Sequence, residues 1–326
     1  MRTNSTNKLG AFGSDLRTIA YFFDKPWNDV SRKTTANEQA WLLNEAAFAL
    51  RALGRMYESL VPTRACVDLS VQLGDWRNAA IYLSNQSELE QLMGALSEAD
   101  DHSEQSVTYA DKGGDVFWMI GTRGIHADAL HQLGRWSDAE SLFCEAEQMQ
   151  AEYQPSCPLL YSLPGFRYCD LLLAPAERHA WRKDGGGRMK DEWIEACRAA
   201  QTVKWAEQNN KALLDITINH LTLARAALYE SILSADSSSS FILPPASFFD
   251  SAVSGLRSAG QQIMLPRALL TRAWHRSLRG KWTGADSAQS DLDEAWKIAS
   301  RGPMPLFMAD IHLSRARLFG TMKDEG

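Results

Sequence analysis

The sequence predicts an all-α protein, a right-handed α-solenoid built from helical hairpins with a repeat near 40 residues. Self-comparison carries this prediction, because Gly54, Gly94 and Gly134 are spaced by 40 residues and one pattern surrounds each of them. Two residues after each glycine stands a large apolar residue: Met56, Leu96 or Trp136. Gly74 and Gly113 divide the units roughly in half. A half-period near 20 residues fits one helix plus a short turn, so each unit is a helix pair.

The run from Leu133 to Ala146 explains why each unit is a hairpin. Gly134 has no Cβ and can take the left-handed conformation that closes a helix. Ser137 and Asp138 follow, where side-chain oxygens suit the start of the next helix. Steps of three and four then place the following residues on one helical face: Trp136, Ala139, Phe143, Ala146 and Met149. The alanines on this face allow another helix to approach closely.

The chain opens with an N-terminal arm, 1–36, that holds one short helix before Pro26. Helix pairs are then predicted at 37–53 with 56–73, 75–92 with 97–112, and 115–133 with 136–153. Single helices follow at 158–174, 191–208, 211–233, 246–259, 262–279, 282–300 and 304–319. The solenoid therefore spans 37–320, and a polar tail covers 321–326.

Two loops are predicted to interrupt the solenoid. The first, 174–189, contains Pro175 and three consecutive glycines at 185–187, and a triple glycine is typical of a flexible loop. The second, 234–245, is a serine-rich run that ends at Pro244 and Pro245.

Two classes of helical repeat fit the period. Tetratricopeptide units run about 34 residues and HEAT-type units about 40 to 47, so the period alone favours HEAT. The small residues Ala127, Ala139 and Ala146, together with Phe143, favour a tetratricopeptide pattern with lengthened helices. Both classes form a curved stack with a concave face.

Several longer runs resemble a bacterial tetratricopeptide array: AFGSDL, AWLLNEAAFALRALGR, DWRNAAI, ADALHQLGRWSDAESLFCEAEQMQ, PLLYSLPGFRYCDLLL, LDITINHLTLARAALY, LPRALLTRAW and ADIHLSRARLF. The resemblance covers about residues 9–320. It is to the C-terminal portion of large signalling proteins, including STAND-type nucleotide-switch ATPases. There the array is a sensor or protein-binding arm, so the resemblance implies a partner-binding role and no catalytic residues.

Composition narrows the function classes. The net charge of −6 argues against a nucleic-acid binder that relies on phosphate attraction. No apolar run approaches the ~18 residues that indicate a membrane span, and the polar N-terminus lacks a secretory signal. The five cysteines show no C-x-x-C spacing, which favours buried, reduced thiols in a cytoplasmic protein.

No residue cluster predicts catalysis, a metal or a cofactor. His126 and His131 diverge by about 140° on a helix, unlike the i,i+4 pair of a zinc helix. Cys169 has no histidine near in sequence and lies beside a leucine run typical of a packed helix. No phosphate-binding G-x-x-x-x-G-K-[ST] run occurs. We therefore expect a non-enzymatic protein.

The first helix of each tetratricopeptide hairpin lines the concave surface. Counting from Gly134 at the repeat spacing, we expect partner contacts from equivalent positions of four helices: Asn44, Phe48 and Arg51; Ser84, Glu88 and Gln91; Arg123, Asp128 and His131; and Leu270 and Trp274.

We expect a protein- or peptide-binding scaffold or sensor arm. The alternative is a regulator in which a small ligand or peptide changes the curvature of the solenoid at its two loops. Because the end of a helical stack must be capped or paired, we also expect weak self-association through residues 304–320, or else a frayed C-terminus.

Overall fold

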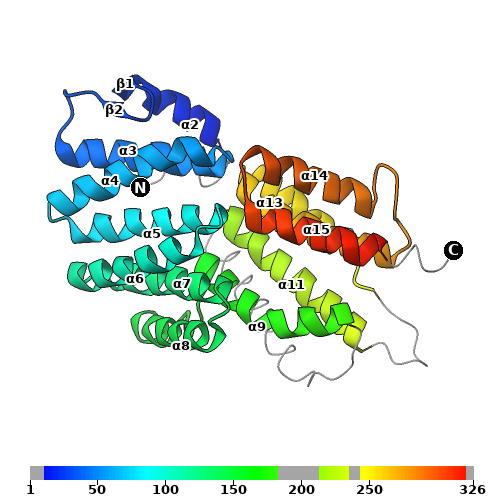
Figure 1. Ribbon diagram of the computed structural model, residues 1–326. Helices are drawn as coiled ribbons and strands as arrows, with labels where there is room; N and C mark the ends of the chain where they lie inside the picture. Colours follow the sequence, from blue (N-terminus) through cyan, green and yellow to red (C-terminus); the bar gives the residue numbers. More distant parts are fainter. Residues whose placement is uncertain (1–10, 183–212, 235–242, 321–326) are drawn as a thin grey trace. The chain divides into compact units, whose positions relative to one another are not determined.

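The computed structural model describes residues 11–182, 213–234 and 243–320 (Figure 1). The predicted all-α class is confirmed for this part of the chain, whose regular structure is helical apart from one short strand pair. Its contacts form two compact units. The first comprises Met1–Leu160 with Arg301–Leu306, and the second Tyr161–Ser300 with Phe307–Gly326.

The first unit is a stack of helical hairpins. Its main helices are α3 (Ala36–Ala52), α4 (Met56–Gln72), α5 (Trp76–Leu92), α6 (Leu96–Gly113), α7 (Val116–Gln132) and α8 (Trp136–Tyr153). Each helix packs against its successor, and α5 also packs against α7. Fully buried alanines line these contacts, among them Ala79, Ala99, Ala127 and Ala139, so the helices approach closely. The neighbour-on-neighbour packing is that of a helical solenoid.

Local signals set where these helices begin and end. Thr35 and Glu38 form a reciprocal capping box at the start of α3, and the Asp75 side chain accepts from the Asn78 amide at the start of α5. The residue that closes α6 is Gly114, at φ 70°, and not the predicted Gly113. Gly113 lies inside the helix, where a Cβ would stand 3.2 Å from the Arg77 backbone nitrogen. Gly113 therefore allows a close approach of two helices, and Gly114 allows the left-handed turn that ends α6.

The N-terminal arm contains more than the one predicted helix. After α2 (Phe12–Ile19) come the 3-10 turn η1 (Ala20–Phe22) and the antiparallel pair β1 (Phe23–Lys25) and β2 (Asp29–Val30). Helix α2 packs against α3, and Phe12 meets Phe48 at a ring-centroid distance of 5.8 Å. The arm thus covers one side of α3.

The second unit contains the remaining described elements: α9 (Ser162–Arg182), α11 (Leu213–Leu233), α12 (Ala246–Ser258), η2 (Gln262–Met264), α13 (Leu265–Leu278), α14 (Ala288–Arg301) and α15 (Pro305–Phe319). Helix α11 packs against α9 and α12, and α12 packs against α13.

A buried ionic network joins α9, α11 and α13. The Asp170 carboxyl forms ion pairs with Arg225 and Arg267. Arg225 Nη1 lies 2.7 Å from Asp170 Oδ1, although the two groups are not aligned for a hydrogen bond. Arg225 Nη2 and the Tyr229 hydroxyl both donate to Glu177, at 2.9 and 2.7 Å. Three helices are therefore held by an ionic network centred on the buried side chains of Arg225 and Asp170.

Two predicted segments differ from the structure, and others lie where it does not describe the chain. The loop expected at 174–189 is wrong over residues 174–182, because α9 continues through Pro175 to Arg182. Ala176 and Ala180 of this segment are buried, and their packing outweighs the backbone hydrogen bond that proline removes. Residues 183–189, most of the second loop and the helix predicted at 191–208 lie outside the described residues. The helix predicted at 282–300 begins only at Ala288, after a turn.

The cysteines also depart in part from prediction. Cys66 and Cys169 are buried and Cys157 is half-buried, but Cys144 on α8 is exposed. Burial raises the pKa of the Cys66 thiol, which keeps it protonated at neutral pH. No helix in the described part of the chain combines the length and apolar character that a bilayer crossing needs.

Candidate functional site

The eleven predicted contact residues fall into two groups by exposure. Six are buried and have little surface to offer a partner: Asn44, Arg51, Ser84, Gln91, Arg123 and Trp274. The other five are half-buried: Phe48, Glu88, Asp128, His131 and Leu270. For this second group, contact with a partner stays a prediction.

Three of the predicted residues meet between α3 and α5. Arg51 pairs with Glu88 at 2.5 Å and donates to the Asn85 carbonyl at 3.0 Å. Asn85 in turn donates its side-chain amide to Asn44 Oδ1 at 3.0 Å. This network joins one hairpin to the next, so the main role of Asn44 and Arg51 is to stabilise the stack.

Arg123 has a similar structural role between α6, α7 and α8. Its guanidinium donates to Asp111 at 2.8 and 3.1 Å and to Glu145 at 2.7 Å. Burial alone would lower the pKa of Arg123, but the two carboxylates outweigh burial and raise it. The side chain is therefore a permanent cation inside the stack.

Trp274 lies in an aromatic cluster of the second unit. Its ring stacks on Trp181 at a centroid distance of 3.6 Å and an interplanar angle of 11°. Tyr229 packs against the same ring at 5.6 Å. The periodic pattern placed Trp274 on α13 but did not reveal this stacking partner on α9.

A continuous row of accessible side chains runs along the first helices of the three hairpins. On each helix the residues of this row are three or four apart and so share a face, while most of their neighbours are buried. We call the row the first-helix strip: Trp41, Glu45 and Phe48 on α3; Ile81, Asn85 and Glu88 on α5; and Gly121, Ile125 and Asp128 on α7.

The strip holds three predicted residues and six that sequence reasoning missed. Phe48, Glu88 and Asp128 occupy equivalent positions; Phe48 contacts Phe12 of α2, and Glu88 pairs with Arg51 of α3. The missed residues include Trp41 and Ile125. The same 40-residue repeat would have predicted them from the positions one and two helical turns before Phe48, Glu88 and Asp128. Apolar and acidic side chains dominate the strip.

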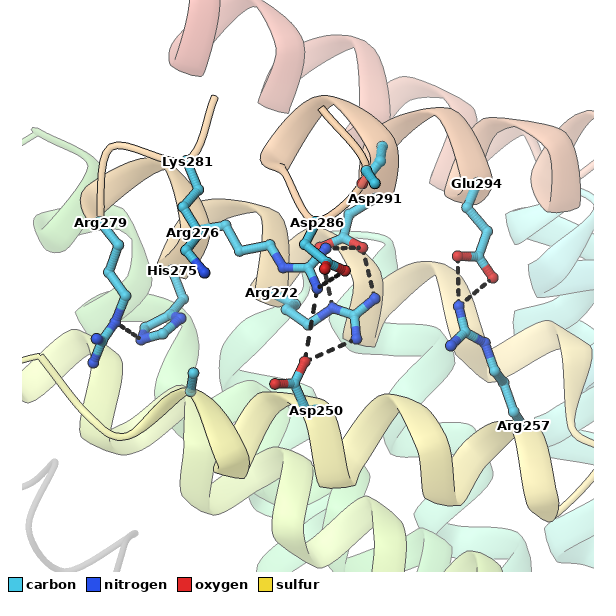
Figure 2. A pocket seen from close by; sticks show the side chains of 13 residues that line it. Asp250, Arg257, Arg272, His275, Arg276, Arg279, Lys281, Asp286, Asp291 and Glu294 are labelled. Atoms are coloured by element: carbon cyan, nitrogen blue, oxygen red, sulfur yellow. Dashed lines mark hydrogen bonds and ion pairs between the residues drawn. The ribbon is translucent and has the colours of Figure 1, made fainter. Parts of the chain in front are cut away.

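A second candidate site is a polar pocket of about 460 Å³ in the second unit (Figure 2). Helix α12 contributes Ala246, Asp250 and Arg257, and α13 contributes Arg272, His275 and Arg276. The turn after α13 and helix α14 complete the lining with Arg279, Lys281, Ala285, Asp286, Ser290, Asp291 and Glu294. The sequence patterns gave no sign of this pocket, because its members come from three helices and a turn without a shared period.

Buried ion pairs fix the middle of the pocket. Arg272 grips Asp291 with two nitrogens, at 2.7 and 3.1 Å, and also reaches Asp250 at 3.1 Å. Arg276 Nη1 lies 3.0 Å from the same Asp291 carboxyl. Burial raises the pKa of Asp291, and the two guanidinium groups oppose that rise. The arrangement holds both arginine side chains in fixed positions.

His275 closes one end of the pocket beside Arg279. Its ring stacks on Phe249 at 4.1 Å, and Arg279 Nε lies 3.0 Å from its Nε2. Burial lowers the pKa of His275, and this effect outweighs the opposing hydrogen bond with the Pro244 carbonyl.

In the first unit, His102 of α6 forms a pH-sensitive contact with Glu90 of α5, with Nδ1 and Oε2 2.7 Å apart. The hydrogen bond that the His102 ring donates to the Glu90 carboxylate raises the pKa of His102. A raised folded-state pKa gives stability that is fully present below the unfolded value of about 6.5 and is lost as pH rises through the folded value.

We therefore expect wild-type stability to fall by about 1 kcal/mol or less from pH 5.5 to pH 8.5 relative to His102→Gln, since the ring is partly exposed. Urea unfolding followed by circular dichroism at the two pH values measures this difference. Equal pH dependence in both proteins would contradict the assignment.

The described residues hold no group of three or more histidine, cysteine, aspartate or glutamate side chains placed to bind a metal ion. His126 instead approaches Asp100, with Nε2 and Oδ1 3.0 Å apart. Comparison with known proteins finds no family model that matches this chain and no match among curated proteins.

Proposed function

We propose that this chain is a non-enzymatic helical-repeat module that binds a protein or peptide partner, as a cytoplasmic scaffold or sensor arm. In this proposal the hairpins form a right-handed, tetratricopeptide-like solenoid with a repeat near 40 residues, related to the arrays of bacterial STAND-type proteins. The observation that carries it is the first-helix strip, in which equivalent positions of three stacked helices stay accessible while most of their neighbours are buried.

The chemistry of the strip suggests the kind of partner. Trp41 is 46% exposed and Ile81 and Ile125 are half-buried, so they offer apolar surface for anchoring side chains. Glu45 and Asp128 add negative charge to the same row, in a chain of net charge −6. We infer a partner segment with apolar anchors and basic residues, laid along the first helices.

A peptide array of basic, acidic and aromatic segments, probed with the full chain, tests this proposal. Trp41→Ala combined with Ile125→Ala is expected to weaken binding to the selected peptides about tenfold or more, because anchors of this kind dominate interface energies. Tyr57→Ala is the matched control, since Tyr57 is a 64% exposed aromatic on the second helix α4 and lies off the strip.

An equal loss of peptide affinity in the strip variant and in Tyr57→Ala would overturn the proposed binding face. Selection of acidic peptides would also overturn it. Glu88→Lys is unsuitable here, because it would place a second cation against buried Arg51 and disturb the stack itself. Asp128→Asn tests the acidic contribution more cleanly and should weaken binding of basic peptides at low salt.

Weak self-association through α15 also belongs to this proposal. Only Ile311 and Leu318 of this helix are buried, and Leu313 is 46% exposed. Sedimentation of Leu313→Glu against the wild type measures it, with a lower average mass expected for the variant.

A further inference from the structure

One end of the pocket in the second unit carries an excess of positive charge. Figure 2 shows Arg279 and Lys281 there with His275, whereas the Arg276 guanidinium lies in the middle with Asp250, Asp286 and Asp291, and Glu294 lies at the far end. We call Arg279 and Lys281 the cationic end. They lie at the end of α13 and in the turn that follows it, so one short stretch of chain delivers both.

The pocket carboxylates are largely neutralised away from the cationic end. Asp291 is held by Arg272 and Arg276, and Asp250 is 3.1 Å from Arg272. At the opposite end Glu294 pairs with Arg257 at 2.6 Å. These pairs leave the carboxylates little charge to offset further cations.

The cations of the turn are not neutralised in this way. Arg279 directs its donors at uncharged acceptors, the Pro244 carbonyl at 2.9 Å and the His275 ring at 3.0 Å. The Lys281 side chain makes no hydrogen bond or ion pair with any other described residue, and it lines the same end. Two full positive charges therefore face this end of the pocket, without a carboxylate partner of their own.

We propose that the cationic end binds the phosphate group of a small phosphate monoester. A volume of about 460 Å³ falls in the range of small-molecule sites. The Arg279 guanidinium and the Lys281 ammonium place two positive charges at one end of the pocket, a pairing that suits a phosphate dianion better than a single carboxylate. Asp250 and the rim residue Asp286 would then accept hydrogen bonds from hydroxyl groups on the organic part of the ligand.

This site is independent of the proposed partner-binding strip, since all its residues belong to the second unit. The probes are inorganic phosphate, methyl phosphate and glycerol 3-phosphate, each titrated into the full chain by calorimetry at constant ionic strength. We expect saturable binding of all three. Glycerol 3-phosphate should bind more tightly than methyl phosphate because only its hydroxyl groups can reach the carboxylates.

Substitutions on the exposed turn separate binding from folding. Arg279→Ala and Lys281→Ala are each expected to weaken phosphate binding about tenfold, the usual effect of losing one charge-assisted hydrogen bond. Lys297→Ala is the matched control, because Lys297 is an exposed cation on α14 that does not line the pocket. Asp286→Asn removes a carboxylate that is 86% exposed and should tighten the binding of methyl phosphate, which has no hydroxyl group to contact it.

If titrating phosphate releases no more heat than titrating chloride at the same ionic strength, the proposed site is wrong. It is also wrong if Lys297→Ala weakens phosphate binding as much as the pocket variants do. Retained affinity in an Arg279→Ala, Lys281→Ala double variant with a native circular dichroism spectrum would place the phosphate elsewhere. Equal affinity for methyl phosphate and glycerol 3-phosphate would remove the hydroxyl contacts from the proposal.

Discussion

Asp170→Ala is expected to lower the free energy of unfolding by about 3–5 kcal/mol, because it leaves two guanidinium groups in the second unit without their shared carboxylate. Arg225 is 4% exposed and Asp170 is 7% exposed, so water cannot replace the lost charge at that arginine. The Tyr229 hydroxyl oxygen and the Glu177 carboxylate accept hydrogen bonds from only part of the Arg225 guanidinium, Nε and Nη2. Chemical unfolding in urea, followed by circular dichroism, measures the difference.

Two further variants separate the buried charge from ion pairing in general. Glu294→Ala breaks the exposed pair with Arg257 in the same unit and should cost at most about 1 kcal/mol. Asp170→Asn keeps the side-chain volume but removes the charge, so its cost should approach that of Asp170→Ala. Similar costs for Asp170→Ala and Glu294→Ala would mean that the arginines reach water when the carboxylate is removed.

The helices of the first unit could be predicted from the sequence because their signals are local. Glycines such as Gly54 and Gly134 close helices, and apolar periodicity shows which face packs, so most boundaries fall within two residues of prediction. The continuation of α9 through Pro175 could not be foreseen, since it depends on what Ala176 and Ala180 pack against. The low helix propensity of a residue such as proline is overcome where burial of its neighbours in the tertiary structure contributes more free energy.

The candidate sites were harder to predict for a physical reason. A charged residue at a repeat position appears accessible until its partner in space is known, and Arg51 and Arg123 find theirs on other helices, at Glu88 and Glu145. The residues of the first-helix strip recur every 40 residues, and three of them, Phe48, Glu88 and Asp128, were predicted. The pocket follows no step, because Arg272 and Asp291 meet only when α13 and α14 pack together.

Phe143→Ala is expected to destabilise the first unit by about 3–5 kcal/mol, the usual cost of emptying a fully enclosed aromatic site. Phe143 has no exposed surface and shares its helix face with Ala139 and Ala146, which are equally buried. Small neighbours on that face bring α7 and α8 close together, so the backbone has little room to collapse into the cavity.

Helix α8 supplies its own control for this experiment. Tyr153 is an aromatic residue at the end of the same helix and is 55% exposed, so Tyr153→Ala should change the unfolding free energy by no more than about 0.5 kcal/mol. Both variants are compared with the wild type by urea unfolding at one pH. A small effect of Phe143→Ala with an unchanged urea dependence would show that the hairpin repacks around the lost ring, and that its alanine contacts alone hold the two helices together.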